Sequence, residues 1–180
     1  MANKPLPPLD FLRECFDYNP VNGRVVWRQR PEHHFTDRSR GLGWNTKYAG
    51  LAGVTDPRGY RKFQISYRGG TRKLSAHRVA YALHHGVVSF GELDHEDGNP
   101  ENNKPGNLRL ATRGQNNANR KRYSKSGLPK GVYKHGGRYM ALAAAGAGKT
   151  AYLGRHDTPE AAHAAFCEFA EKRHGGFFRA

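Results

Sequence analysis

Residues 94–119, DHEDGNPENNKPGNLRLATRGQNNAN, combine side chains that could hydrolyse a phosphodiester bond. Such a reaction needs a base that takes a proton from water and a cation that holds the phosphate and the leaving oxygen. His95 is the candidate base, because an unperturbed imidazole titrates at about pH 6.5. Asp94 could bind a hard cation, and the seven Asn of this stretch offer carbonyl oxygens that suit Mg²⁺ or Mn²⁺, or that fix the second nitrogen of a histidine. The residue types therefore indicate a one-metal nuclease, with a long turn as the alternative.

The charge distribution also indicates a polyanionic partner and a cation. The net charge is +15, and the sequence pI is about 10.2, which favours binding to nucleic acid. Residues 57–91 contain no acid, and residues 102–156 contain twelve Lys or Arg and again no acid. Between them lies an acidic island made of Glu92, Asp94, Glu96, Asp97 and Glu101. These carboxylates would repel a polyanion unless a divalent metal ion lay between them and the ligand.

Other features exclude some classes of protein. Cys15 and Cys167 are far apart and form no C-x-x-C pair, so no structural zinc is expected. The sequence shows no apolar run of membrane-spanning length and no signal peptide, which predicts a cytoplasmic protein without a membrane partner.

The pattern of apolar and turn residues predicts an α+β fold. Gly86 is expected to end a short helix, and Asn22-Gly23 and Gly69-Gly70 are expected to turn two hairpins. We predict helices over 9–16, 77–86 and 158–174, strands over 24–27, 131–135, 138–145 and 149–155, a hairpin over 59–77, a long loop over 29–48 and a basic linker over 120–130. On a strand, neighbouring side chains point to opposite faces, so Asp94 and His95 can serve one site only if the strand twists or ends there.

The segments LDHEDGN, NN and GNLRLATRGQNNAN closely resemble the HNH family of endonucleases, in the variant where the later His positions are Asn. The resemblance covers residues 74–120. It implies a ββα-metal finger, made of two strands, a loop and a helix. It also implies one divalent cation, Mg²⁺ or Mn²⁺, and duplex DNA as substrate.

This resemblance also implies roles for individual residues. His95 would be the general base, and Asp94 and Asn116 would bind the metal. Asn107 would orient His95 through its carbonyl oxygen. Asn119, one helical turn beyond Asn116, would support the site or touch the phosphate. The remaining amides of the stretch are expected only to shape the loop: Asn99, Asn102 and Asn103.

A second resemblance covers residues 126–178, which are similar to the Apetala-two, or ethylene-response-factor, DNA-binding domain. It depends on Gly131-Val132, Arg138-Tyr139, Tyr152-Leu153-Gly154 and the segment 158–166. Tyr139 stands where the plant domains usually have Trp, so their sequence preference is not transferred. The resemblance implies a three-stranded antiparallel sheet, packed on one helix, that lies in the major groove. The implied DNA contacts are Lys130, Tyr133, Lys134, Arg138, Tyr139, Lys149 and Arg155.

Together these patterns predict a metal-dependent endonuclease of the homing or phage type. We expect an N-terminal extension over 1–56, an HNH nuclease domain over 57–122 and a DNA-binding domain over 123–180. One finger cuts one strand, so cleavage of both strands would need a dimer or two successive events. Two alternatives stay open: a DNA-binding protein without catalysis on a decayed HNH scaffold, and a protein that binds or cuts RNA.

Overall fold

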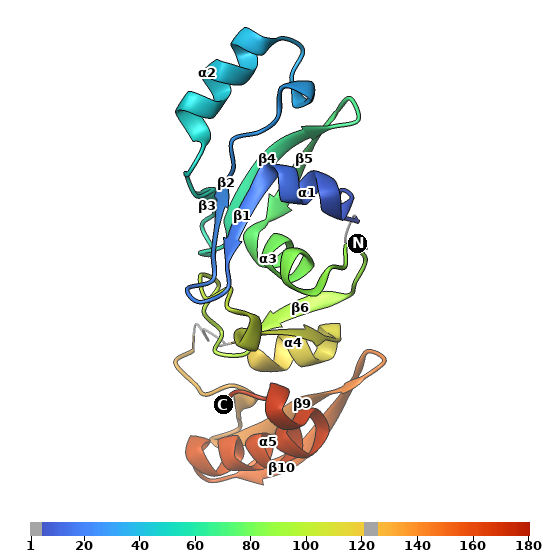
Figure 1. The fold of residues 1–180 in the computed structure, drawn as a ribbon. Helices are drawn as coiled ribbons and strands as arrows, with labels where there is room; N and C mark the ends of the chain where they lie inside the picture. The colour runs from blue at the N-terminus through green and yellow to red at the C-terminus, as the bar shows by residue number, and fades with distance from the viewer. Residues whose placement is uncertain (1–4, 121–125) are drawn as a thin grey trace. The chain divides into compact units, whose positions relative to one another are not determined.

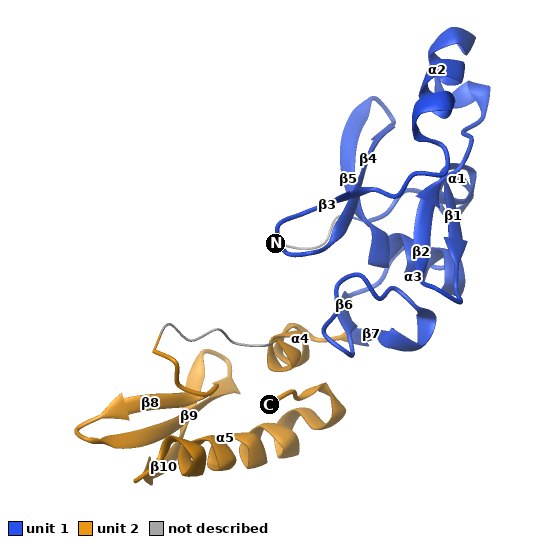
Figure 2. Cartoon of the chain, turned by 90° about the vertical axis from the view of Figure 1, so that its left-hand side faces the viewer, with its two compact units in different colours: residues 1–110 blue, residues 111–180 orange. Residues whose placement is uncertain are grey.

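The computed structural model describes residues 5–120 and 126–180, so the expected linker over 120–130 falls partly outside the described residues, at 121–125. The chain divides into two compact units, Met1–Leu110 and Ala111–Ala180 (Figure 2). Figure 1 shows the elements in chain order. They are α1 Leu9–Cys15, β1 Phe16–Asn19, β2 Arg24–Trp27, η1 Glu32–His34, α2 Arg38–Tyr48, β3 Val54–Thr55, β4 Arg61–Tyr67, β5 Gly70–Ser75, α3 Ala76–His85, β6 Glu92–His95, η2 Pro105–Asn107, β7 Leu108–Ala111, α4 Arg113–Asn119, β8 Val132–His135, β9 Arg138–Gly146, β10 Lys149–His156, α5 Pro159–His174 and η3 Gly175–Phe177.

The first unit contains small antiparallel sheets around one aromatic core. β1 pairs with β2, and β3, β4 and β5 form a three-stranded sheet. Phe16 stacks on Trp27 at 4.6 Å and meets Phe63 edge-on at 4.8 Å between ring centroids. Burying such a side chain stabilises a fold by about 1.5–3 kcal/mol. Residues on both sides of position 56 contribute to this core, so the expected extension 1–56 packs together with the start of the expected nuclease domain.

One predicted loop in this unit is wrong. Residues 29–48 were expected to be a long loop, but they contain η1 and the eleven-residue helix α2. The Asp37 side chain caps this helix by accepting the backbone amide of Arg40 at 2.8 Å. Trp44 on the helix meets Trp27 of the core edge-on at 5.0 Å. Tyr48, one helical turn further, also packs against the core. Two aromatic residues among polar neighbours form too short a periodic pattern to predict a helix.

The β1–β2 hairpin holds the Asn-rich loop of the first unit in place. Gly23 lies in its turn with φ +74°, and a Cβ there would lie 2.7 Å from the amide nitrogen of Lys104. Only glycine allows this close approach of two backbones. Tyr18 on β1 donates its hydroxyl to the backbone oxygen of Asn103 at 2.8 Å, and burial raises the pKa of this tyrosine to about 12. The hairpin therefore holds the loop at Asn103 and Lys104.

The second unit confirms the expected three-stranded antiparallel sheet on one helix. β9 lies in the middle, between β8 and β10. α5 covers one face of this sheet (Figure 2), where Val132, Ala141 and Ala162 form a buried cluster. Thr158 caps α5 by accepting the amide of Ala161 at 3.2 Å. The strand and helix ranges agree closely with those predicted.

The division between the units falls inside the segment expected to form the finger. β6 pairs with β7, and β7 crosses the division at 110/111, while α4 belongs to the second unit. The expected domain boundary at 122/123 instead falls among residues 121–125, outside the described residues. Over residues 5–120 and 126–180, no helix is long and apolar enough to cross a membrane.

Candidate active site

Asp94 and His95 are the last two residues of β6, and both are buried, with 4 % and 5 % of their surface exposed. The chain turns directly afterwards, because the amide of Gly98 donates to the backbone oxygen of His95 at 2.8 Å. The two neighbouring side chains contact different partners: Asp94 contacts β7, and His95 contacts the Asn-rich loop. The strand therefore ends at Asp94 and His95. This is one of the two conditions under which these neighbouring side chains could serve one site.

The Asp94 carboxylate forms an ion pair with Arg109 on β7. The Arg109 Nε atom lies 3.0 Å from Asp94 Oδ2, and the guanidinium also approaches Glu96, with Nη1 3.7 Å from Oε1. Only 5 % of the Asp94 side chain is exposed. A carboxylate that is so deeply buried needs a cationic partner or strong hydrogen bonds. Arg109 therefore neutralises Asp94 through one carboxylate oxygen.

The His95 imidazole is held by the amide of Asn103. His95 Nε2 lies 3.1 Å from Asn103 Oδ1, and Asn103 Nδ2 donates to the backbone oxygen of Glu101 at 3.3 Å. Because the amide nitrogen is directed to a carbonyl oxygen, its own oxygen faces the ring. Nε2 then carries the ring proton, and Nδ1 of the neutral ring carries the lone pair. Asn103 thus fixes both the tautomer and the orientation of the candidate base.

Two other rings enclose His95. Its centroid lies 5.2 Å from that of His77 and 5.8 Å from that of Tyr60. Burial lowers the pKa of His95, while the hydrogen bond to Asn103 and the charges of Asp97 and Asp94 raise it only in part. Burial likewise lowers the pKa of His77 to about 3, assisted by the charges of His95, Lys62 and Arg78. His95 is therefore neutral at pH 7, the state that a general base needs.

The position of Asn107 requires a correction. We expected it to orient His95, but its hydrogen bonds go to the loop. Its Oδ1 accepts the amide of Asp97 at 3.0 Å, and its Nδ2 donates to Asp97 Oδ1 at 3.0 Å and to the backbone oxygen of Asn102 at 2.7 Å. Asn107 lies on η2, which begins two residues after Asn103. It therefore acts on His95 only indirectly, by holding the loop that carries Asn103.

Asp97 is the centre of that loop. Although burial raises its pKa, hydrogen bonds from the side chain of Asn102, the backbone of Asn99 and the side chain of Asn107 lower it overall. The distances from Asn102 Nδ2 to Asp97 Oδ2 and from the Asn99 amide to Asp97 Oδ1 are 2.7 and 2.8 Å. Asn99, Asn102 and Asn107 thus shape the loop around one carboxylate, as expected for the first two. Asn103 differs, because its side chain reaches the base.

Asn116 and Asn119, the remaining residues expected in the site, lie on α4 of the second unit. A complete capping box starts this helix: Thr112 Oγ1 accepts the amide of Gln115 at 3.3 Å, and Gln115 Oε1 accepts the amide of Thr112 at 2.8 Å. Asn119 is buried, with 5 % of its surface exposed. Asp94, in contrast, belongs to the first unit.

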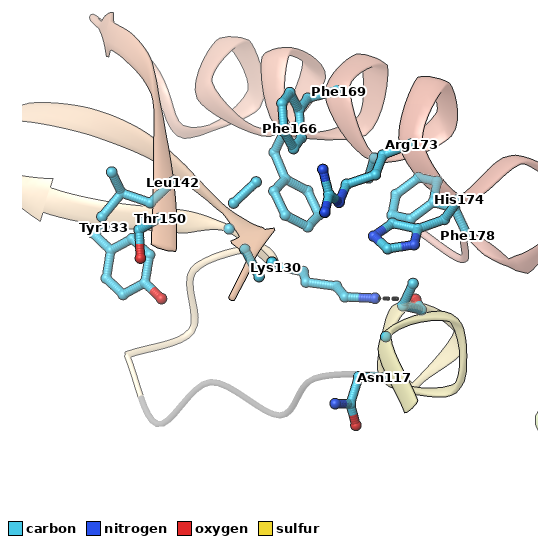
Figure 3. Close-up of a pocket in the computed structure, with 17 residues that line it drawn as sticks. Asn117, Lys130, Tyr133, Leu142, Thr150, Phe166, Phe169, Arg173, His174 and Phe178 are labelled. Atoms are coloured by element: carbon cyan, nitrogen blue, oxygen red, sulfur yellow. Dashed lines mark hydrogen bonds between the residues drawn. The ribbon is translucent and has the colours of Figure 1, made fainter. Parts of the chain in front are cut away.

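Lys130 has a different role from the expected DNA contact. Its Nζ donates to the backbone oxygens of Ala118, Arg120 and Arg179, at 2.5, 3.1 and 3.0 Å. Figure 3 shows this side chain reaching the end of α4, beside a cavity of about 580 Å³. All three ammonium protons are used, so Lys130 ties α4 and the C-terminus to the sheet. Burial also lowers its pKa.

The strand register sorts the other expected DNA contacts onto two faces. Antiparallel partners share a face, and Tyr133 and Arg155 both pair with Met140 on the face opposite α5. Lys134 instead pairs with Tyr139, whose ring packs against the core under α5. Tyr139 is therefore half-buried against this core, and its role in DNA contact stays a prediction. The expected contacts with exposed side chains are Tyr133, Lys134, Arg138, Lys149 and Arg155.

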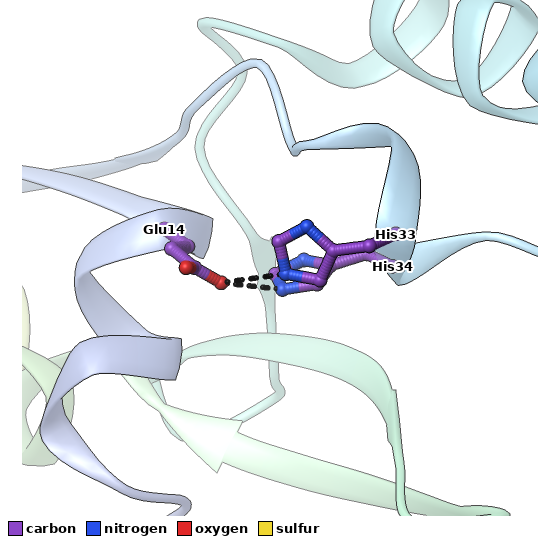
Figure 4. Close-up of side chains that lie close together, drawn as sticks. All are labelled: Glu14, His33 and His34. Carbon is purple, nitrogen blue, oxygen red and sulfur yellow. Dashed lines mark hydrogen bonds and ion pairs between the residues drawn. The ribbon is translucent and has the colours of Figure 1, made fainter.

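The first unit also contains a cluster that the sequence did not indicate, formed by Glu14, His33 and His34 (Figure 4). The Nε2 atoms of His34 and His33 lie 2.7 and 3.3 Å from Glu14 Oε2. These ligand atoms lie close enough together to hold a metal ion. However, Arg30 Nε donates to His34 Nδ1 at 3.3 Å, which places the ring proton on Nε2, the atom that would have to bind the metal. The contacts therefore favour a hydrogen-bonded cluster.

Comparison with known proteins agrees with part of this interpretation. Residues 75–118 match the family model described as HNH endonuclease. The match includes Asp94, His95, Asn107 and Asn116, and it ends one residue before Asn119. Searches of curated proteins and of solved structures gave no significant match. The family match supports an HNH nuclease domain in residues 75–118, and with it a nuclease-type function that acts on DNA.

Proposed function

We propose that this chain is a metal-dependent DNA endonuclease that hydrolyses phosphodiester bonds in duplex DNA. The observation that carries the proposal is the buried His95, held by Asn103 in a single tautomer, inside the segment that matches HNH endonucleases. Its lowered pKa gives a neutral imidazole at pH 7.

In this mechanism Nδ1 of His95 accepts a proton from a water molecule as the water oxygen attacks phosphorus. The bond from phosphorus to the 3′-oxygen breaks, and that oxygen takes a proton from solvent, which leaves a 5′-phosphate and a 3′-hydroxyl. Asn103 keeps the imidazole aligned through the attack. Asn107 maintains the loop on which Asn103 lies.

The donor set fits a hard divalent cation. Asp94 would supply a carboxylate oxygen and Asn116 an amide oxygen, both of which suit Mg²⁺ or Mn²⁺, with Asn119 in support. When bound, the ion would neutralise charge on the phosphate and the leaving oxygen. Arg109 already pairs with one oxygen of Asp94, so it would hold the carboxylate in one orientation.

The second unit would anchor the chain on DNA. In this proposal residues 57–122 cut, and residues 123–180 bind through the sheet face opposite α5, with Tyr133, Arg138, Lys149 and Arg155 as contacts and Lys134 at its edge. The layout is that of the homing or phage type of nuclease. Because such an interface neutralises several phosphates, the affinity should fall steeply with salt.

One observation favours a second candidate, a DNA-binding protein without catalysis. The Asp94–Arg109 ion pair supplies a cation to the carboxylate from within the protein, as a decayed metal site would. A protein that binds or cuts RNA is a further rival, and it would show no preference for duplex DNA in competition binding.

A supercoiled-plasmid assay tests the proposal. The full chain is incubated with Mg²⁺ or Mn²⁺ and with EDTA, alongside His95→Ala and, as a matched control, His85→Ala, which changes an exposed histidine. Nicked or linear product that needs both metal and His95, but not His85, supports the nuclease. If wild type and His95→Ala shift duplex DNA equally and neither cuts a plasmid that carries the gene's own flanking DNA, the non-catalytic reading is correct.

A further inference from the structure

The sheet face opposite α5 has an unusual composition for a surface expected to read DNA. The register places Leu142 of β9 beside Tyr152 of β10, and Met140 beside Tyr133 of β8. The next pair along β9 is Ala144 with Thr150. The middle of this face is therefore apolar and aromatic across all three strands, and we call these residues the apolar row: Tyr133, Met140, Leu142, Ala144, Thr150 and Tyr152.

The apolar row is accessible. Tyr152 is 60 % exposed and Tyr133 38 % exposed, whereas their neighbours on the other face, such as Ala141 and Ala143, are buried under α5. A contiguous exposed patch of apolar and aromatic side chains marks a surface that binds a partner. The buried core of the unit lies on the opposite face, and Tyr133, Leu142, Ala144 and Thr150 also line the cavity of Figure 3.

The charge around the apolar row indicates which partner it takes. Arg155 pairs with Met140 and so lies on the same face, as does Arg138, which pairs with His135 two residues beyond Tyr133. Lys149 is exposed at the start of β10. No acid occurs between residues 102 and 156. Arg138 also forms an ion pair with the exposed Asp157, with Nε 2.8 Å from Oδ1, so Lys149 and Arg155 are the bordering cations that lie outside this ion pair. Duplex DNA matches this arrangement, because it presents phosphates at the edges of a groove and less charged base edges at its floor.

The chemistry of the groove floor then specifies the base. Polar side chains read bases by hydrogen bonds, and the hydroxyl groups of the row, those of Tyr133, Thr150 and Tyr152, lie on the two outer strands. On the central strand β9, Met140, Leu142 and Ala144 offer no strong donor or acceptor. In the major groove the apolar group presented by a base is the C5 methyl of thymine, which side chains recognise by apolar contact.

We propose that the apolar row selects DNA sites that carry thymine, by packing Leu142 and its neighbours against thymine methyl groups in the major groove. This inference rests on the proposed DNA binding of the second unit. It assigns Leu142 and Tyr152 as specificity-determining residues, with Arg138, Lys149 and Arg155 contributing affinity that is independent of sequence.

The test replaces thymine by uracil, which removes only the methyl group and keeps base pairing and charge. Sequences bound by the full chain are first selected from a random duplex pool in EDTA, so that no cleavage occurs. The selected duplex is then synthesised with single dT→dU changes, and its affinity is measured by fluorescence anisotropy. Each contacted methyl should contribute about fourfold in affinity, since burying one such group is worth ~0.8 kcal/mol.

Variants then assign the effect to residues. Leu142→Ala should abolish the T-to-U difference at one position of the site, and Tyr152→Phe, which keeps the ring, should preserve it. Arg155→Ala should weaken the T and U duplexes equally. Circular dichroism confirms that each variant is folded.

Two results would overturn the inference: a selected site without recurring thymine, or equal affinity for the T and U duplexes. Cleavage is measured separately, on plasmid with Mn²⁺. Loss of cleavage with the T-to-U difference intact would refute the nuclease alone, and cleavage without that difference would refute the thymine preference alone.

Discussion

Replacing Asn103 should identify the group that orients the candidate base. Asn103→Ala removes the amide oxygen that lies 3.1 Å from His95 Nε2, from a residue that is 3 % exposed. The ring proton would then lack this buried acceptor, which costs about 1–3 kcal/mol when no replacement is found. Partners that orient a catalytic or ligating histidine typically contribute 10- to 100-fold, so we expect the nicking rate to fall by about that factor.

The pH profile separates an orienting role from a structural one. The bond to Asn103 raises the pKa of His95, because it stabilises the protonated ring more than the neutral ring. Asn103→Ala should therefore lower this pKa and move the acidic limb of the rate profile to lower pH. Asn103→Asp places a carboxylate at Nε2, so it should raise the pKa and move the limb to higher pH.

The assay is single-turnover nicking of plasmid at saturating Mn²⁺ over pH 5.5–9, with binding measured in parallel in EDTA. Asn99→Ala is the matched control, because Asn99 is an exposed loop amide whose side chain accepts only the amide of Glu101, at 3.1 Å. The reasoning is refuted if Asn103→Ala cuts within twofold of wild type. It is also refuted if the rate falls while the two Asn103 variants leave the acidic limb in place.

Three further predictions concern stability, each measured by urea unfolding. His77 has a pKa of about 3 in the folded protein against an ordinary 6.5, so below pH 6.5 the unfolded chain binds more protons than the folded one. The free energy of unfolding should therefore fall as the pH drops below 6.5, by at most about 1.4 kcal/mol per pH unit. His77→Gln should remove this pH dependence, and an unchanged dependence would exclude His77 as its source. Lys130→Met leaves three carbonyl oxygens without their charged donor and should lower the free energy of unfolding by roughly 2–4 kcal/mol. If the folded variant also binds DNA much more weakly than wild type, Lys130 is a DNA contact after all. Gly131→Ala places a Cβ 2.1 Å from the ring of Phe166, at a backbone φ of +80°, and should lower the free energy of unfolding by at least about 3 kcal/mol. Gly176→Ala is the control, because open space surrounds Gly176, and it should be nearly neutral. Equal effects of the two changes would contradict the packing of α5 on the start of β8.

Local chemistry explains why much of the second unit could be predicted. Thr158 and Pro159 start α5, and Gly-rich turns separate three short strands, so each boundary is set by residues next to it in the sequence. The α2 helix shows the opposite case. It packs on the core through Trp44, which reaches Trp27 seventeen positions earlier, and through Tyr48. Two aromatic residues form too short a pattern to predict a helix.

The functional residues show the same contrast between local and distant determinants. The sequence by itself determined that Asp94 and His95 lie together in a segment of HNH type, because adjacent residues and a recurrent spacing carry that information. That a strand ends at this pair came from the structure. Only the tertiary structure decided which amide holds the base. Asn99, Asn102, Asn103 and Asn107 are chemically identical, and what distinguishes Asn103 is that Tyr18, from a hairpin far back in the chain, fixes its backbone so that its side chain meets His95. The same applies to Lys130 and Tyr139, because residue type alone does not show whether a Lys or a Tyr lies on the surface or packs inward. The three backbone carbonyls around its Nζ decide this for Lys130, and the strand register decides it for Tyr139.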